Sequence, residues 1–154
     1  IAINYSTFIG NEKPDTAKQM RYFQNFYGIF HISDRFHITA GFDYGMEQVS
    51  KGSSDFNSWY SPVVIVRYDL NDTWSVAARG EYYADENGVI IATGTENGFK
   101  TTGFSLNLDC RIRDNAVWRI EGRLLNSEDN IFNDAAGVAT NANTAVTTSL
   151  AISF

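Results

Sequence analysis

The sequence predicts an all-β fold, an up-and-down antiparallel β-barrel with about eight strands in this chain. Three observations support this: polar and apolar residues alternate with a period of two, turn-forming residues separate the alternating stretches, and helical periodicity is weak. Most stretches reach the roughly 9–11 residues that a tilted strand needs to cross a bilayer. The predicted strands lie near residues 1–9, 21–32, 36–47, 59–69, 74–84, 102–113, 117–125 and 145–154.

The connections between these strands alternate in length. The short ones are residues 33–35, 71–73 and 114–116, and the long polar ones are residues 10–20, 48–58, 85–101 and 126–144. In an antiparallel sheet this alternation places the short turns at one end and the long loops at the other. No break in composition marks a second domain, so residues 1–154 are predicted to form one domain.

Composition excludes several classes of protein. The chain has 154 residues, with 12 Lys and Arg against 18 Asp and Glu, which disfavours a basic nucleic-acid-binding protein. The single cysteine, Cys110, excludes an intrachain disulfide framework and a multi-cysteine metal cage. The longest apolar runs, 63–66 and 89–92, are too short for a transmembrane helix. The chain opens at Ile1 without a basic leader region, so we expect a mature chain or a fragment of one.

The alternation separates an apolar face from a polar face. From the second predicted strand onward, no even-numbered strand position carries a charge, whereas odd-numbered positions carry charged and small residues. Alternation by itself leaves open which face lies inside. A soluble ligand-binding barrel places apolar side chains inward, and a membrane barrel places them outward.

Aromatic residues on the even-numbered face favour the membrane orientation. They gather in two rows, one near the short turns and one near the long loops, with aliphatic residues between them, as in the interfacial girdles of membrane barrels. The short-turn row comprises Phe30, Phe36, Tyr68, Trp74, Trp118 and Phe154, and the long-loop row comprises Tyr22, Tyr44, Tyr60, Tyr82 and Phe104.

The cations support the same orientation. All four lysines fall in predicted loops or at their edges, whereas the strands use arginine, which tolerates a crowded, partly desolvated ion-pair network better than lysine does. In a wide barrel the charged odd positions would set ion preference, and in a closed eight-stranded barrel they would fill the lumen. The charged residues predicted to line the lumen are Asp43, Glu47, Arg67, Asp69, Arg79, Glu81, Asp109, Arg111, Arg119, Glu121 and Arg123.

One hairpin allows a prediction of register. If strands 102–113 and 117–125 pair across their short turn, Arg111 can face Glu121 and Asp109 can face Arg123, forming a ladder of ion pairs.

No constellation for catalysis or metal binding emerges from the sequence. Glu81 and Glu121 each have an arginine two residues away, which keeps a carboxylate ionised and unsuited to general-acid catalysis. His31 and His37 can pair across the first short turn, but two imidazoles without a nearby carboxylate make a poor metal site. The acidic segment 128–134 lacks the spacing of a calcium-binding EF-hand loop. We therefore predict a protein that is not an enzyme and that has no catalytic residue, metal or cofactor.

Several motifs resemble one family of membrane proteins. They are Arg79–Gly88 (RGEYYADENG), Leu106–Asp109 (LNLD), Trp118–Arg123 (WRIEGR) and a last strand that closes on Phe154, and most of the likeness lies in residues 60–154. Together they resemble the C-terminal region of the putative β-barrel porin-2 (OmpL-like) family. The resemblance implies location in the outer membrane of a Gram-negative bacterium, contact with outer-membrane lipid, and recognition of Phe154 by the barrel-assembly machinery. Members of that family are generally longer, so residues 1–154 would be a whole barrel or the C-terminal part of one.

The leading functional hypothesis is a porin-like channel for passive passage of small hydrophilic solutes through a charged lumen. Two alternatives remain open at this stage. One is a small closed, non-conducting outer-membrane barrel that acts as a structural or surface-interaction module. The other is a soluble ligand-binding β-barrel with the faces reversed.

Overall fold

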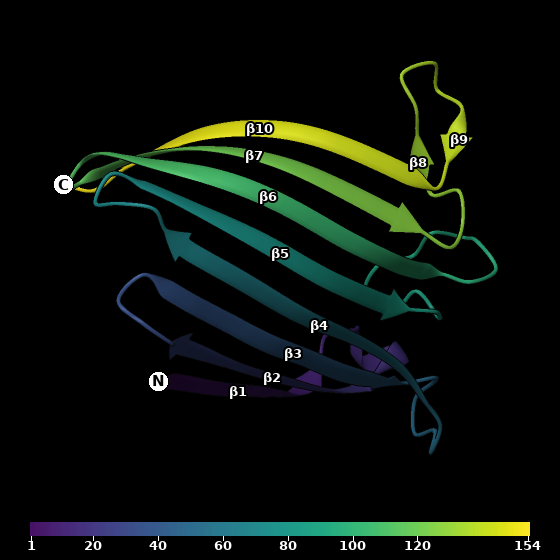
Figure 1. Ribbon diagram of the computed structural model, residues 1–154. Coiled ribbons are helices and arrows are strands. Elements are labelled where there is room, and N and C mark those ends of the chain that lie inside the picture. Colours follow the sequence, from purple (N-terminus) through teal and green to yellow (C-terminus); the bar gives the residue numbers. More distant parts are fainter.

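A single antiparallel sheet of eight long strands dominates the computed structural model, which describes residues 1–154 (Figure 1). Strands follow one another in chain order across the sheet, which confirms the predicted all-β, up-and-down topology. Each predicted strand has a counterpart, with ends displaced by three residues at most. The strands are β1 (Ala2–Asn11), β2 (Met20–His31), β3 (Phe36–Gln48), β4 (Phe56–Asp69), β5 (Trp74–Asp85), β6 (Phe99–Arg113), β7 (Ala116–Ser127) and β10 (Ala142–Ile152).

Short additional elements occupy two of the long loops. A one-turn 3₁₀ helix, η1 (Asp15–Ala17), lies between β1 and β2, and a small hairpin of β8 (Phe132–Asn133) and β9 (Ala139–Thr140) precedes β10. The chain has no helix of the length and apolarity that a membrane span requires.

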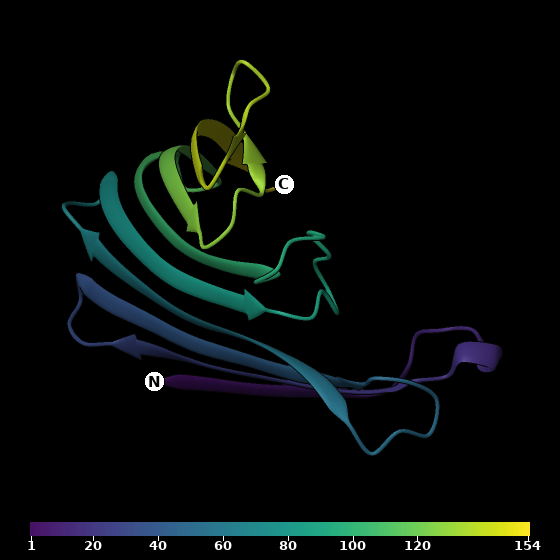
Figure 2. The same ribbon diagram turned by 90° about the vertical axis from the view of Figure 1, so that its right-hand side faces the viewer.

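The sheet is curved but open. Figure 2 shows it bending into a trough, with β1 along one edge and β10 along the other. These two strands pair only with β2 and β7 respectively, so the ring of strands that defines a barrel is not completed within this sheet.

Side chains within the short turns fix the hairpin ends. The Ser33 hydroxyl accepts hydrogen bonds from the backbone N–H groups of Arg35 and Phe36, at 3.3 and 3.1 Å. The Asn71 side-chain oxygen accepts from the N–H groups of Thr73 and Trp74, both at 2.9 Å. Such side-chain-to-backbone bonds favour tight reversal of the chain. Because the strands run up and down in chain order, the short turns lie together at one end of the sheet and the long loops lie at the other (Figure 1).

Strand register keeps the two faces separate across the sheet. From β2 to β10 even-numbered residues pair with even-numbered ones, as in the Tyr44–Tyr60 and Leu108–Ile120 pairs, except at the irregular Arg113–Ala116 pair. β1 joins with the opposite parity, because Tyr5 lies opposite Phe26. We call the face formed by odd-numbered residues of β2 to β10 and even-numbered residues of β1 the polar face, and the opposite one the apolar face.

The predicted register of the β6–β7 hairpin is wrong. Arg111 lies opposite Val117 rather than Glu121, and Asp109 lies opposite Arg119 rather than Arg123, a difference of four residues along β7. Two local features cause the shift: the turn contains only two residues before β7 begins at Ala116, and the pairing is irregular between Arg111 and Arg113. A tight two-residue connection and a bulge both fix register independently of side-chain charge.

Burial is the reverse of that in a soluble β-protein. Only 13 of 154 residues are buried, and the hydrophobic ones among them are Trp59 and Ala84, whereas seven are polar or charged. Large side chains of the apolar face are exposed, for example Leu106 at 58% and Val146 at 72%. A soluble ligand-binding barrel would bury this apolar face, so the observed burial opposes that alternative.

Candidate functional site: the charged polar face

The structure places all the charged residues predicted to line the lumen on the polar face. Asp43 and Glu47 come from β3, and the others come in pairs or threes from β4, β5, β6 and β7. Arg21 of β2, which is not among the predicted lumen residues, lies opposite Glu47 on the same face. Its odd-numbered position at the start of the predicted strand 21–32 is the signal that could have found it.

A continuous polar network crosses the sheet near the short turns. We call it the turn-end network, and its members are His31, His37, Arg67, Asp69, Asp109 and Arg119. Arg119 donates to both carboxylate oxygens of Asp109, at 2.6 Å each, and Asp109 also lies 3.8 Å from a guanidinium nitrogen of Arg67. Arg67 in turn lies 3.0 Å from Asp69. The two-point contact with Arg119 replaces the Asp109–Arg123 pair that the sequence predicted, and its fork geometry is the strongest form of this ion pair.

The two histidines extend the turn-end network to β2. The Nδ1 atoms of His31 and His37 lie 2.9 Å apart across the hairpin, and His37 Nε2 lies 3.3 Å from Asp69. The sequence-based premise that no carboxylate lies near this pair is therefore wrong, because β4 brings Asp69 beside it. No cluster of three His, Cys, Asp or Glu side chains in the chain has a geometry that could hold a metal ion.

A second ion-pair group lies midway along the strands. Glu81 of β5 contacts Arg79 on its own strand and accepts a hydrogen bond of 2.8 Å from Arg123 of β7. Gly103 makes room for this carboxylate, since a Cβ there would approach Glu81 Cγ within 2.7 Å. Two arginines from different strands therefore share one carboxylate, and the chemistry available here is electrostatic attraction.

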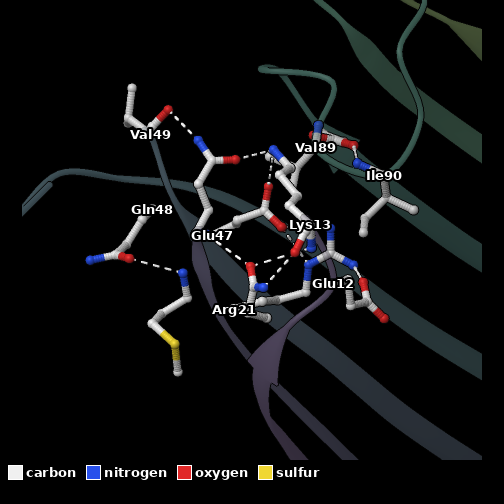
Figure 3. Close-up of polar contacts among 12 residues, drawn as sticks. Glu12, Lys13, Arg21, Glu47, Gln48, Val49, Val89 and Ile90 are labelled. Carbon is white, nitrogen blue, oxygen red and sulfur yellow. Dashed lines mark hydrogen bonds and ion pairs between the residues drawn. The ribbon is translucent and has the colours of Figure 1, made fainter. Parts of the chain in front are cut away.

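The third group lies at the end of the sheet where the long loops are. Figure 3 shows Glu12, Lys13, Arg21 and Glu47 pointing toward one another from the first long loop, β2 and β3; we call them the loop-end cluster. Glu47 is 5% exposed and lies 2.7 Å from Arg21 and 2.8 Å from Lys13. Arg21 also contacts Glu12, which is 53% exposed. The buried carboxylate thus has two cationic partners, as burial of a charge requires.

Aspartates hold the long loops in place at the same end of the sheet. The fully buried carboxylate of Asp85 accepts hydrogen bonds from the backbone N–H groups of Val89, Ile90 and Ile91, at 2.8, 2.7 and 2.9 Å. Asp129 accepts from the backbone and side chain of Asn97, both at 2.9 Å, which joins two long loops. These bonds, first of all the one from the Asn97 side chain, hold the pKa of Asp129 below its ordinary value of 3.8.

Two cavities open on the polar face toward the short turns, with volumes of about 580 and 500 Å³. Both are lined by Arg67, Asp69, Asp109 and Arg119 of the turn-end network, and the second also reaches Glu121. Glu121 has no ion-pair or hydrogen-bond partner within the chain, unlike Asp109. The polar face can therefore present both fixed ion pairs and a free carboxylate to a solute.

The observed register makes a direct prediction about coupling. In a double-mutant cycle, the Asp109→Asn and Arg119→Gln changes should show a coupling free energy of about 1 kcal/mol or more, because the two side chains share two hydrogen bonds. The Arg111→Gln and Glu121→Gln changes should be additive, since these residues lie four positions out of register. Urea unfolding of the four variants and their doubles in detergent micelles measures both cycles. Additivity at Asp109 and Arg119 would contradict the register.

Comparison with known proteins places the chain in a family. A family model described as "Putative beta-barrel porin-2, OmpL-like" matches residues 1–154, the whole chain and thus more than the 60–154 segment that carries most of the sequence resemblance. No curated protein and no solved structure matches the chain. The match over the full length confirms the resemblance noted in the sequence, and the chain belongs to the putative β-barrel porin-2, OmpL-like, family.

Proposed function

We propose that this protein is part or all of an outer-membrane β-barrel through which small hydrophilic solutes pass passively along a charged lumen. One observation carries the proposal: the apolar face is exposed along the sheet, while the polar face buries the carboxylates of Glu47 and Asp109 in ion pairs. An exposed apolar surface of this extent is unfavourable in water and favourable against lipid. Family membership supports the same orientation and the porin-like role.

The two aromatic rows of the apolar face support the proposed membrane location. Tyr60 and Tyr82 of the long-loop row have ring centroids 6.0 Å apart, and Phe42, outside the row, lies 6.4 Å from Tyr60. In the short-turn row, the indole N–H of Trp118 donates to the Thr148 hydroxyl at 2.8 Å. Rings at these two heights would lie at the two lipid–water interfaces, which aromatic side chains prefer. Contact with outer-membrane lipid and recognition of Phe154 by the barrel-assembly machinery belong to this proposal.

Closure of the barrel is a necessary part of the proposal. The edges of β1 and β10 carry unpaired backbone groups, which lipid cannot satisfy. If the two edges pair with each other, eight strands enclose a lumen only wide enough for side chains, and the ion-pair groups fill it. If further strands lie between the edges, the lumen widens and leaves an aqueous path.

A second candidate function follows from the density of the ion pairs. Glu47 and Asp109 are buried by their arginine partners, which is the expected filling of a narrow, non-conducting barrel. In that case the long loops would be the functional part, as a structural or surface-interaction module.

Reconstitution separates these candidates. We expect the protein to require detergent for solubility, to fold in lipid vesicles, and to give conductance steps in a planar bilayer, with permeability that falls as solute size increases. A folded protein that inserts without conductance would reject the channel and support the surface-interaction module. A protein that stays monodisperse without detergent would reject the membrane location altogether.

Ion selectivity provides a residue-level test of the lumen. Glu121→Gln should shift ion selectivity toward anions, seen as a shift of the reversal potential under a salt gradient, because the free carboxylate lines a cavity of the polar face. Asp114→Asn, which removes the same charge from the exposed two-residue turn, is the matched control and should leave the potential unchanged. Equal shifts in both variants would mean that Glu121 does not face the conducting path.

A further inference from the structure

Aromatic side chains on the polar face gather at one end of it. They come from β1, β2, β4, β5 and β6, and all of them except Tyr27, near the middle of β2, lie close to the long loops. These residues are Phe8, Phe23, Tyr27, Trp59, Tyr83 and Phe99. A face that otherwise carries charged and small residues therefore has one concentrated group of aromatic rings, at the level of the long loops.

Four of these rings line a cavity of about 370 Å³ together with Ile90 of the loop 86–98. Trp59 is held in place by three contacts: Phe23 stacks against it with ring centroids 6.4 Å apart, Arg21 lies 5.5 Å from its centroid, and Gly45 lies beneath its indole. Phe8 and Tyr83 complete the aromatic wall, and Phe8 is 40% exposed. The buried Asp85 carboxylate fixes Ile90 beside the loop-end cluster, where Figure 3 shows it.

The charges that line this cavity are not balanced. Arg21 already serves Glu12 and the buried Glu47. Asp43, the other carboxylate in the wall, has no cationic partner and accepts only a hydrogen bond of 2.5 Å from the Asn25 side chain. One unpaired carboxylate among aromatic rings fits a cation whose charge is carried by an apolar group.

We propose that this cavity is a binding subsite for small organic ammonium ions. The ammonium group would lie between the Asp43 carboxylate and the rings of Phe8 and Tyr83, which attract it through their negative faces. A metal cation fits less well, because no group of three carboxylate, imidazole or thiol side chains is arranged to bind one. An uncharged aromatic solute could stack on the rings but would form no ionic interaction with the Asp43 carboxylate. The subsite rests on the proposed channel function, for which it names a class of solute.

Choline and its neutral carbon isostere, dimethylbutanol, form a matched pair of probes. They share size and hydroxyl group, and only choline is charged. Isothermal titration calorimetry on the full chain folded in detergent micelles should show binding of choline at least about tenfold tighter than that of the isostere. Equal binding of the two compounds, or binding of neither, overturns the proposal.

Two variants test the residues that carry the proposal. Asp43→Asn keeps an acceptor oxygen for Asn25 but removes the charge, so choline affinity should fall about tenfold while affinity for the isostere is unchanged. Phe8→Leu keeps an apolar side chain but removes the ring, and choline affinity should fall about threefold. Asp55→Asn, an exposed loop position outside the cavity, is the control for net charge and should bind choline like the unaltered protein. A choline affinity that Asp43→Asn leaves unchanged overturns the proposal.

Binding and conduction are measured separately, so their failures are distinguishable. Calorimetry reports the subsite whether or not the lumen conducts. Choline binding in a protein without conductance would reject the channel and retain the site, whereas conductance without discrimination between choline and its isostere would retain the channel and reject the site.

Discussion

Glu47→Gln is expected to lower the free energy of unfolding by about 2–4 kcal/mol. The carboxylate is almost fully buried on the polar face and is the shared partner of Arg21 and Lys13. Removing its charge leaves the Arg21 guanidinium, itself largely buried, with only the exposed Glu12 for a counter-ion. The loss falls below the full cost of breaking a buried ion pair because Lys13 is partly exposed to water.

Glu12→Gln is the matched control for that variant. It removes a carboxylate from the same arginine, but Glu12 is 53% exposed, and exposed ion pairs contribute less than about 1 kcal/mol. Urea unfolding in detergent micelles, followed by tryptophan fluorescence, measures both variants, with Trp59 beside Arg21 as a local reporter. Equal losses in the two variants would mean that burial of Glu47 does not determine the strength of the cluster.

Gly45→Ala is expected to destabilise the protein by about 3 kcal/mol, or to prevent the loop-end half of the sheet from packing. A Cβ at this position would lie 2.0 Å from Trp59 Cζ2, and two further indole atoms would lie within 2.6 Å. The indole cannot move aside freely, because Phe23 and Arg21 cover it. Only a residue without a side chain leaves room for a tryptophan on the polar face here.

Gly122→Ala tests whether the loss of stability in Gly45→Ala comes from the clash with Trp59 or from the replacement of any glycine within a strand. A Cβ at Gly122 meets nothing within 4 Å, and the position lies on the apolar face of β7. Alanine there should be neutral or slightly stabilising, since it restricts the unfolded chain. The same unfolding measurement applies, and a loss at Gly122 as large as that at Gly45 would contradict the steric explanation.

The strands and their faces could be predicted because both depend on local alternation. In β3 the run from Phe36 to Glu47 alternates without interruption, and the structure places its even and odd residues on opposite faces. The turns at Ser33 and Asn71 were also visible, since the residue types that hydrogen-bond to the backbone are present in the sequence. These features need no knowledge of distant residues.

Ion-pair partners could not be predicted with the same success, because they depend on register. The sequence showed that Asp109 and Arg123 share a face. The two-residue turn and the irregular pairing near Arg113 set a register in which Asp109 pairs with Arg119 instead. The link from His37 to Asp69 crosses to a third strand, and the link from Lys13 to Glu47 comes from a loop. Small local departures from regular pairing therefore decide which charges meet.

By itself the sequence determined an all-β chain of eight alternating strands, with one apolar face and one charged face and with loops of alternating length. The tertiary structure decided three further properties: that the polar face is the more buried one, which charges pair across it, and that aromatic rings from four strands line a cavity with an unpaired Asp43. The physical reason is that a period of two is set by the geometry of a single strand, whereas burial and pairing are set by contacts between strands far apart in the chain.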